Sequence, residues 1–376
     1  MRVDRFLEII GSDFYAGVPD SQLKEICLFL IDRFGIDPKH HIIAANEGNC
    51  VGLAAGYYLS TGKVPVVYMQ NSGEGNAINP IVSLLNEKVY AIPMIFIIGW
   101  RGEPDLHDEP QHIFQGEITL KLLEDIGVKY CAFDSSIDES RLLSIINGFQ
   151  KELAQGRQVA FVIRKGSLSY DTKSAFKNNY LISREEAIKH IIAVADDDLI
   201  ISTTGKASRE LFEIREANKQ SHENDFLTVG SMGHASSIAF EIAVNCPEKK
   251  VWCLDGDGAL LMHMGSMAVI GSNKPDNLIH VIINNSAHET VGGMPTVASN
   301  MDIVSVAKAC GYYYAVSVND YEELDQVLIE AKRINKLSMI VINCSISSRG
   351  DLGRPTTTPV ENKKMFMNFI MRDRQE

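Results

Sequence analysis

The sequence has no pair of closely spaced cysteines and no excess of positive charge. Its seven cysteines form no CxxC motif and no spacing typical of a zinc site. The odd count, with no long apolar stretch after Met1, predicts a reducing, cytoplasmic environment. The net charge of −12 argues against nucleic acid or an acidic membrane surface as a partner. The net charge does not exclude a small anionic substrate, because arginines at the binding site can outweigh the charge of more distant acids.

Long hydrophobic runs are also missing. The longest apolar stretch, residues 91–100, contains Pro93 and Gly99 and is too short to cross a bilayer. The composition, 45% hydrophobic and 22% charged, is that of a globular protein. Because 376 residues exceed the usual size of one domain, we expect two domains and no membrane span.

Short apolar runs alternate with helical patterns along both halves of the chain. The main predicted strands are 41–44, 64–69, 91–98, 199–202, 250–254 and 278–283. Strands that alternate with helices predict parallel, doubly wound sheets. Residues 166–181 carry turn residues without periodicity and mark the domain boundary. The sequence therefore predicts an α/β fold with domains over residues 1–170 and 180–376. The last part of the second domain, from Ser345 onwards, has a mixed pattern.

A distinctive polar stretch follows the predicted strand at residues 250–254. It reads Asp255-Gly256-Asp257-Gly258 and leads into a predicted helix at 259–270; the next strand ends in Asn284-Asn285. Open α/β sheets bind ligands at the carboxyl ends of their strands. Side-chain oxygens of Asp and Asn suit Mg2+, which commonly bridges to phosphates. The backbone N–H groups at the start of the helix can face a diphosphate.

This stretch resembles the GDG…NN signature of thiamine diphosphate enzymes. The resemblance implies a Mg2+ ion that holds the cofactor's diphosphate, bound by the side chains of Asp257 and Asn285 and the backbone carbonyl of Ala287. Gly256 and Gly258 would let the backbone approach the cofactor closely. The resemblance also implies two doubly wound parallel-sheet domains, one that binds the pyrimidine and one that binds the diphosphate, without a middle domain.

Glu47 stands where a predicted strand meets a helix rich in glycine and alanine. Its residue type alone fits an ordinary solvent-facing position at a helix start. In thiamine diphosphate enzymes, however, a glutamate at the start of such a helix contacts N1′ of the aminopyrimidine. The segments Asn46-Glu47-Gly48-Asn49 and Ala54-Ala55-Gly56 resemble that arrangement. The resemblance implies that Glu47 exchanges a proton with the cofactor, for which a buried carboxyl of raised pKa is suited.

Further motifs resemble cofactor contacts of the same family. Met232, in Gly230-Ser231-Met232-Gly233, resembles the bulky residue that props the cofactor into a bent shape, although a core methionine would fit the same pattern. The polar turn after the predicted strand at 199–202 can donate to the diphosphate. The remaining cofactor contacts that we expect are Asn71, Gly73, Thr204, Gly205, Ser208 and Gly230.

Several loops resemble those of a narrower group, the phosphonopyruvate decarboxylases, whose near relatives are the sulfopyruvate decarboxylases. The loops are 17–21, 70–76, 100–102, 108–112 and 349–355. The resemblance covers nearly the whole chain and implies decarboxylation of 3-phosphonopyruvate to phosphonoacetaldehyde and CO2. The family pattern places each site between the first domain of one subunit and the second domain of another. At least a homodimer is therefore expected.

The implied substrate is a 2-oxo acid with a second anionic group. Guanidinium groups recognise phosphonates well, so Arg101, Arg349 and Arg354 are candidate substrate ligands, although each also fits an ordinary surface position. Gln111 and His112 resemble polar residues that face the substrate in related enzymes, and histidine is a fit proton donor near neutral pH. 

Three points stay open at the level of sequence. Asp20 could assist protonation or merely cap its helix. Larger pyruvate decarboxylases carry adjacent histidines where this chain has Gln111 and His112. They also have a glutamate after the asparagine pair; the nearest one here is Glu289, at a different offset, so the roles of His288 and Glu289 stay open.

Other functions remain as alternatives. They are sulfopyruvate decarboxylation, an acetolactate-synthase-like carboligation, a dinucleotide-binding oxidoreductase and a non-catalytic binding module. The oxidoreductase is disfavoured because residues 256–261 lack the third glycine of GxGxxG. The binding module is disfavoured because Glu47 and the metal motif occur together.

Overall fold

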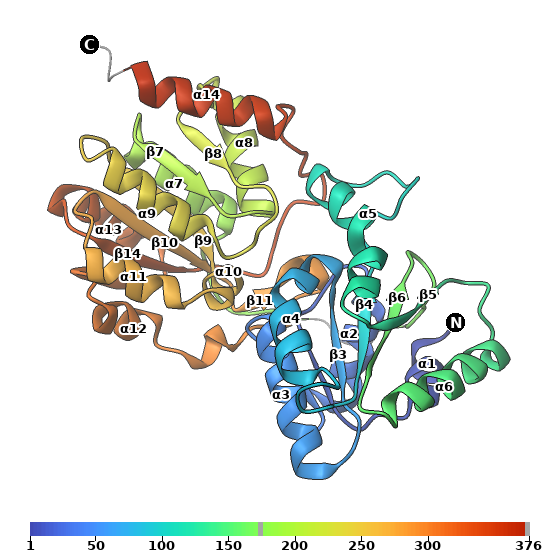
Figure 1. Cartoon of the computed structure of the whole chain (residues 1–376). Coiled ribbons are helices and arrows are strands. Elements are labelled where there is room, and N and C mark those ends of the chain that lie inside the picture. The colour runs from blue at the N-terminus through green and yellow to red at the C-terminus, as the bar shows by residue number, and fades with distance from the viewer. Residues whose placement is uncertain (172–175, 373–376) are drawn as a thin grey trace. The chain divides into compact units, whose positions relative to one another are not determined.

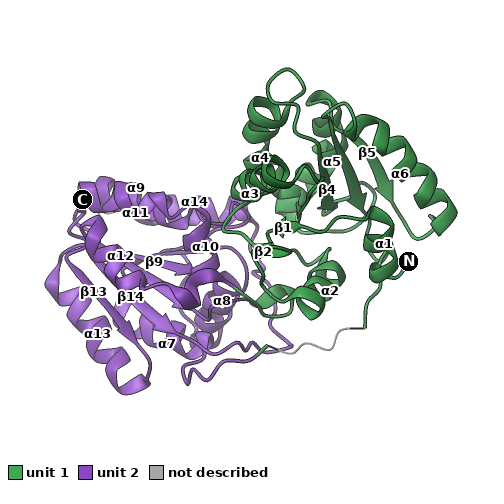
Figure 2. Ribbon diagram, turned by 90° about the horizontal axis from the view of Figure 1, so that it is seen from below, with its two compact units in different colours: residues 1–176, 288–295 green, residues 177–287, 296–376 purple. Residues whose placement is uncertain are grey.

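The computed structural model describes residues 1–171 and 176–372, and it divides into two compact units (Figures 1 and 2). Unit 1 comprises Met1–Phe176 and His288–Pro295. Unit 2 comprises Lys177–Ala287 and Thr296–Glu376. In the described residues each unit is built on its own six-stranded parallel sheet with helices packed around it.

Unit 1 has the strand order β2-β1-β3-β4-β6-β5. The strands are β1 (Tyr15–Gly17), β2 (His41–Ile43), β3 (Val66–Gln70), β4 (Met94–Gly99), β5 (Lys129–Phe133) and β6 (Gln158–Ile163). The helices are α1 (Val3–Ile10), α2 (Lys24–Phe34), α3 (Glu47–Thr61), α4 (Glu74–Pro80), α5 (Pro110–Asp125) and α6 (Glu139–Leu153), with a 3-10 turn at Asn71–Gly73 and a π turn at Ile81–Leu85. Every residue of β4 and β6 is buried, as expected for parallel strands covered on both faces.

Unit 2 repeats this architecture with the strand order β13-β14-β10-β9-β7-β8. The strands are β7 (Leu199–Ser202), β8 (Asp225–Leu227), β9 (Val251–Gly256), β10 (Leu278–Asn284), β13 (Tyr314–Val318) and β14 (Ser338–Asn343). The helices are α7 (Arg184–Ala195), α8 (Lys206–Asn218), α9 (Ala235–Asn245), α10 (Asp257–Met262), α11 (Gly265–Asn273), α12 (Ile303–Cys310), α13 (Tyr321–Ile334) and α14 (Pro359–Arg372). The predicted pair of doubly wound parallel sheets is confirmed, and the described ranges contain no middle domain.

Two of the differences from the sequence-based expectation concern helices. The helix predicted at 259–270 is interrupted, because His263 leaves the helical conformation and packs its ring 4.3 Å from the ring of His234. The tail, which showed no clear pattern, contains α14. Only Asn362 and Phe366 of that helix are buried, and Asn362 caps the edge strand β8 by accepting the N–H of Leu227 at 3.0 Å. Such sparse burial leaves a weak periodicity in the sequence.

Residues His288–Pro295 lie in unit 1, although the chain on both sides of them belongs to unit 2. Val291 and Met294 are buried in the hydrophobic core of unit 1, and Gly292 lies beside Leu28 of α2. The segment starts with the second residue of β11 (Ala287–His288) and ends with β12 (Met294–Pro295), which form a small two-stranded sheet. None of the helices in the described ranges combines the length and hydropathy needed to cross a membrane.

Glu74 is a buried acid at the start of α4. It is 3% exposed, and neither carboxyl oxygen has a hydrogen-bond partner among the described residues. Burial raises its pKa from an ordinary 4.5 to about 8. The folded protein therefore holds Glu74 as a neutral acid at pH 7.

We predict that Glu74→Gln changes how stability depends on pH. Between pH 4.5 and 8 the unfolded chain ionises Glu74 while the folded chain keeps it protonated, so native stability should fall as pH rises. The variant should lack this fall, and its stability relative to the native protein should rise by about 4 kcal/mol from pH 5 to pH 9. Urea unfolding across this range measures the effect. Glu117→Gln, at an exposed position on α5, is the matched control. Parallel stability curves for Glu74→Gln and the native protein would contradict the prediction.

Candidate functional site

The predicted metal ligands meet at one edge of the unit 2 sheet. Strands β9 and β10 are parallel neighbours, and Gly256 pairs with Ile283 near their carboxyl ends. Asp257 begins α10 directly after β9, and Asn285 follows β10. The backbone N–H of Asn285 donates a hydrogen bond to the Asp257 carboxylate. The fold thus brings together two residues that the sequence separates by a strand and two helices.

Asp257 is a buried carboxylate with an exposed fraction of 3%. Burial raises its pKa to about 6, although several donors oppose the shift: the Thr296 hydroxyl, 2.5 Å from Oδ2, and the backbone N–H groups of Gly258 and Asn285. An ionised carboxylate in such a place is stabilised by a neighbouring cation.

The loop after β10 supplies the other predicted ligands. The Asn285 side-chain oxygen accepts the Ala287 N–H at 3.0 Å, which fixes the side chain in a local turn. Ser286 between them has a left-handed φ of 55°, and its N–H and hydroxyl both donate to the side-chain oxygen of Asn284. One carboxylate, one amide oxygen and one backbone carbonyl make an all-oxygen donor set. This chemistry fits a hard ion such as Mg2+.

The predicted diphosphate contacts lie at the carboxyl ends of β7 and β8. The Gly230 N–H donates to the Thr204 hydroxyl at 3.0 Å, so these two loops are joined. Gly205 precedes α8 with a φ of 100°, a backbone conformation that favours glycine. Met232 is half-buried in the next turn, between residues 231 and 233, both of which have positive φ.

Ser208 is placed differently from its predicted role as a donor to the cofactor. It is buried in α8, and its hydroxyl donates to the Thr203 carbonyl at 2.7 Å. The Ser202 hydroxyl lies at the same distance. Since a serine hydroxyl carries one hydrogen, this geometry leaves none for a phosphate. The contacts describe a residue that holds the polar turn together.

Glu47 is buried at the start of α3 in unit 1. Asn46 caps this helix by accepting the Asn49 N–H at 2.8 Å. The Glu47 carboxylate accepts a hydrogen bond from the side chain of Asn76 at 3.0 Å. A Cβ atom built on Gly73 would lie 2.4 Å from Cγ of Glu47. Gly73 therefore leaves the space that the glutamate side chain occupies.

Asn71, a predicted cofactor contact, is bonded within unit 1. Its amide nitrogen donates to the Arg101 carbonyl and to the Thr119 hydroxyl, both at 2.8 Å. Its oxygen accepts the Arg101 N–H at 3.1 Å. The side chain thus ties the end of β3 to the loop after β4 and to α5.

Asp20 is a buried acid in the loop after β1. Its carboxylate accepts hydrogen bonds from the Gln70 side chain and from the Gln22 N–H. Burial raises its pKa, while the Gln70 hydrogen bond and the charge of Arg101 oppose the shift. A Cβ atom on Gly99 would lie 2.3 Å from its Oδ2, so the end of β4 must be glycine to admit this side chain.

The Arg101 guanidinium, a predicted substrate ligand, binds the carboxylate of Asp108. Two of its nitrogens contact the two Asp108 oxygens, and a third donates to the Ser21 hydroxyl at 3.1 Å. Burial opposes ionisation of Asp108, but this hydrogen bonding lowers its pKa to about 2. The pair is ionic at neutral pH and closes the loop that leads into α5.

Gln111 and His112 lie in the first turn of α5. The Gln111 side-chain oxygen and the His112 Nδ1 are buried and have no hydrogen-bond partner in the described part of the chain. Burial and the nearby Arg101 lower the pKa of His112 to about 4. Its imidazole is therefore neutral at pH 7 and donates through a single N–H, which differs from the expectation of a proton donor near neutral pH. Neighbouring polar atoms without partners are typical of a ligand site.

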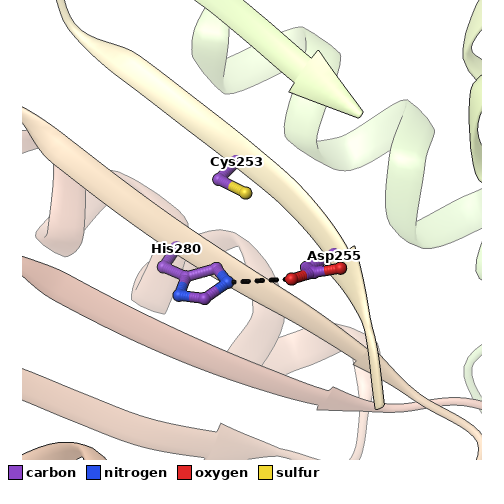
Figure 3. A group of neighbouring side chains, drawn as sticks. All are labelled: Cys253, Asp255 and His280. Carbon is purple, nitrogen blue, oxygen red and sulfur yellow. Dashed lines mark hydrogen bonds and ion pairs between the residues drawn. The ribbon is translucent and has the colours of Figure 1, made fainter. Parts of the chain in front are cut away.

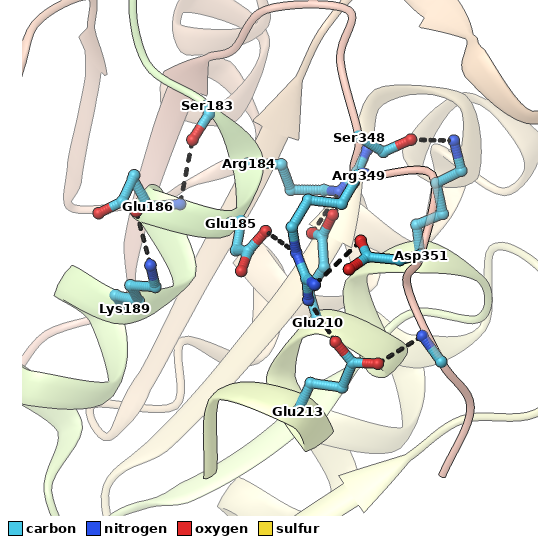
Figure 4. A network of polar contacts seen from close by, with 12 residues as sticks. Ser183, Arg184, Glu185, Glu186, Lys189, Glu210, Glu213, Ser348, Arg349 and Asp351 are labelled. Atoms are coloured by element: carbon cyan, nitrogen blue, oxygen red, sulfur yellow. Dashed lines mark hydrogen bonds and ion pairs between the residues drawn. The ribbon is translucent and has the colours of Figure 1, made fainter. Parts of the chain in front are cut away.

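Arg349 lies in the loop after β14 and is surrounded by acids (Figure 4). Its guanidinium contacts Glu185 at 2.9 Å, Asp351 at 3.2 Å and also Glu213. These hydrogen bonds raise the pKa of Arg349. Arg354 is exposed in the same loop. In this conformation Arg349 fastens the loop to α7 and α8, and binding a substrate would require it to exchange these partners.

The chain was compared with known protein families and with curated proteins. Residues 3–125 match the N-terminal TPP binding domain of thiamine pyrophosphate enzymes, and residues 203–344 match the C-terminal TPP binding domain. A phosphonopyruvate decarboxylase from Streptomyces viridochromogenes is 31% identical, covering 96% of this chain and 92% of its own. The chain belongs to the thiamine pyrophosphate enzyme family.

Two further relatives extend the comparison. A sulfopyruvate decarboxylase from Methanosarcina acetivorans is 28% identical over 98% of this chain and 97% of its own. The sulfopyruvate decarboxylase subunit beta of Methanocaldococcus jannaschii is 35% identical and covers 50% of this chain but 97% of its own. The predicted family, the thiamine diphosphate (pyrophosphate) cofactor and the reaction class, decarboxylation, are confirmed. The substrate of the relatives is an oxo acid.

Sequence reasoning missed several residues around the predicted cofactor site. The Asp255 carboxylate lies 3.4 Å from Nε2 of His280 (Figure 3). It also accepts the Gly256 N–H at 2.9 Å, and Nδ1 of His280 faces the Tyr312 hydroxyl. With Cys253, these side chains form a buried cluster beneath the turn that carries Asp257. The repeated Asp-Gly pattern hints at Asp255, whereas nothing in the sequence marks His280.

Thr296 and Asn76 were also missed, although they bind the carboxylates of Asp257 and Glu47. His288 and Glu289, whose roles the sequence left open, lie in the segment that belongs to unit 1. Burial lowers the pKa of His288 to about 4. 

We predict that Gly73→Ala displaces Glu47 without unfolding unit 1. The added methyl group would overlap the Glu47 side chain, so the carboxylate must move. Turnover should fall about 100-fold, the usual cost of misplacing a catalytic group by about 1 Å. Gly75→Ala is the matched control, since no described atom lies within 4 Å of a Cβ at that exposed position. Circular dichroism checks the fold, and equal turnover by both variants would contradict the assignment.

Proposed function

We propose that this protein decarboxylates 3-phosphonopyruvate to phosphonoacetaldehyde and CO2, using thiamine diphosphate and Mg2+. The observation that carries the proposal is the contact between the Asp257 carboxylate and the Asn285 N–H, which places an all-oxygen donor set at the sheet edge of unit 2. The substrate is argued from the relatives: the phosphonopyruvate decarboxylase is 31% identical, against 28% for the full-length sulfopyruvate decarboxylase.

Each half of the chain supplies one part of the cofactor site in this proposal. Asp257, Asn285 and the Ala287 carbonyl hold Mg2+, and the turn at Thr204 and Gly205, with residues 230, 232, 256 and 258, receives the diphosphate end. When bound, thiamine diphosphate supplies the sink for the electrons released as the carboxylate leaves. Glu47, fixed by the Asn76 amide, exchanges a proton with N1′ of the pyrimidine.

The substrate end of the proposal rests on unit 1. The unpartnered oxygen of Gln111 and Nδ1 of His112 provide neutral hydrogen-bonding groups. Asp20, whose pKa is raised by burial, is an acid able to give a proton to the carbon that loses CO2. Arg101, together with Arg349 and Arg354 of unit 2, supplies positive charge for the second anionic group.

The first test is a CO2-release assay on phosphonopyruvate with and without thiamine diphosphate and Mg2+. Omitting either should abolish release. Glu47→Gln should lower turnover at least 100-fold, within the range expected for a lost acid–base group, while Glu117→Gln should not change it. Faster release from sulfopyruvate in direct competition would assign that substrate instead. A product with a new C–C bond would indicate carboligation.

We infer further that the protein works as a homodimer or larger assembly, with each site formed by unit 1 of one subunit and unit 2 of another. Unit 1 offers a surface suited to a second copy. Leu59 of α3 and Tyr90 after the π turn are 71% and 68% exposed. A Cβ on Gly52 or Gly56 of α3 would meet no described atom within 4 Å, so another backbone can approach closely.

Subunit mixing tests this arrangement. Glu47→Gln and Asp257→Asn should each be inactive alone, because each removes one part of every site. Co-expression should restore about a quarter of native activity, since half of the dimers are mixed and each mixed dimer has one intact site. The double variant co-expressed with an inactive single variant is the control and should stay inactive. No recovery in mixed dimers isolated with two affinity tags would show that one chain builds a whole site.

A further inference from the structure

Thr296 forms the shortest side-chain contact to the predicted metal site. Its hydroxyl donates to Oδ2 of Asp257 at 2.5 Å, across 39 positions of sequence. The side chain is 4% exposed, and the same oxygen accepts the Ala298 N–H at 3.4 Å. The hydroxyl hydrogen is therefore directed at Asp257, while a lone pair is held by the backbone.

The backbone of Thr296 is fixed to the other ligand loop. Its N–H donates to the Ser286 carbonyl at 2.9 Å. Ser286 lies between Asn285 and Ala287, which carry the second and third predicted ligand oxygens. The pairing of β11 with β12 continues this link, with the Gly293 N–H bonded to the His288 carbonyl at 3.0 Å. One residue thus bonds through its side chain to the first residue of α10, directly after β9, and through its backbone to the loop after β10.

We propose that Thr296 is a positioning residue for Mg2+, which sets the spacing between Asp257 and the Asn285–Ala287 loop before the ion binds. The proposal rests on the proposed function, because it takes these three residues as ligands. Groups that hydrogen-bond a metal ligand from outside typically contribute 10- to 100-fold to metal affinity. Mg2+ demands near-ideal octahedral geometry, whereas Ca2+ accepts looser and larger arrangements. A residue that fixes the distance between the metal ligands should therefore favour binding of Mg2+ over binding of Ca2+.

A purely structural role for Thr296 makes a different prediction. Thr296 also caps the 3-10 turn Val297–Asn300, and its loss could loosen that turn alone. Asp302 provides a matched comparison, since it caps α12 by accepting the Ser305 N–H at 3.0 Å. Asp302→Ala should disturb the same region without touching a metal ligand.

The experiment titrates Mg2+, and separately Ca2+, into the full chain with thiamine diphosphate present, and reads binding by calorimetry. Thr296→Val keeps the shape of the side chain but removes the hydroxyl, and should weaken Mg2+ binding 10- to 100-fold with a smaller loss for Ca2+. Thr296→Ser keeps the hydroxyl and should stay within about threefold of native, as should Asp302→Ala.

The outcomes separate the proposal from the function on which it rests. If the native protein binds neither metal, the proposed Mg2+ site fails whatever the variants do. If the native protein binds Mg2+ and Thr296→Val binds it equally well, or loses both metals equally, the positioning role is overturned. If Thr296→Val does not fold, as judged by circular dichroism, Thr296→Ala under the same titrations decides the question.

Discussion

The site in unit 2 depends on one constraint, a carboxylate buried at the end of a parallel strand. Strand β9 carries Asp257 to the sheet edge, where most of its surface is removed from water. An ionised group in that position must be compensated by donors or by a cation. The strand pairing that holds β9 beside β10 brings Asn285 to the same edge. The same strand register therefore produces the buried carboxylate and sets further oxygen atoms beside it, an arrangement suited to the proposed Mg2+.

Unit 1 also contains buried acids, which are satisfied in different ways: Glu103 pairs with the Arg164 guanidinium, whereas others accept neutral amides. Glu47 accepts the Asn76 amide, and Asp20 accepts the Gln70 amide. Glu74 has no partner among the described residues and is protonated at pH 7 because burial raises its pKa to about 8. Burial raises the carboxyl pKa at Asp20 and Glu74, and such a shift suits proton transfer, in which a group must take up and release a proton near neutral pH.

The sequence allowed the sheets and the central contact to be predicted because both follow from local rules. Alternating strands and helices imply parallel sheets, and consecutive strand ends place Asp257 near Asn285. The contacts that were missed connect distant segments. Thr296 is 39 positions from Asp257 in the sequence. Arg349, in a loop, binds Glu185 of α7 and Glu213 of α8. Periodicity reports which face of an element is buried, but it carries no information on which polar groups meet there.

The arginine pairs bear on how a doubly anionic substrate would be distinguished from related acids. Arg101 is bound by Asp108 and Arg349 by three acids, so neither guanidinium awaits a ligand in this conformation. If these arginines bind the substrate as proposed, its oxyanion would have to replace a carboxylate that already bears a negative charge. A sulfonate, which carries one charge, would offer little electrostatic gain in that exchange, whereas a phosphonate, which can carry a second charge, would gain more. In the proposed site, internal ion pairing of this kind would therefore favour the more highly charged of two competing anions.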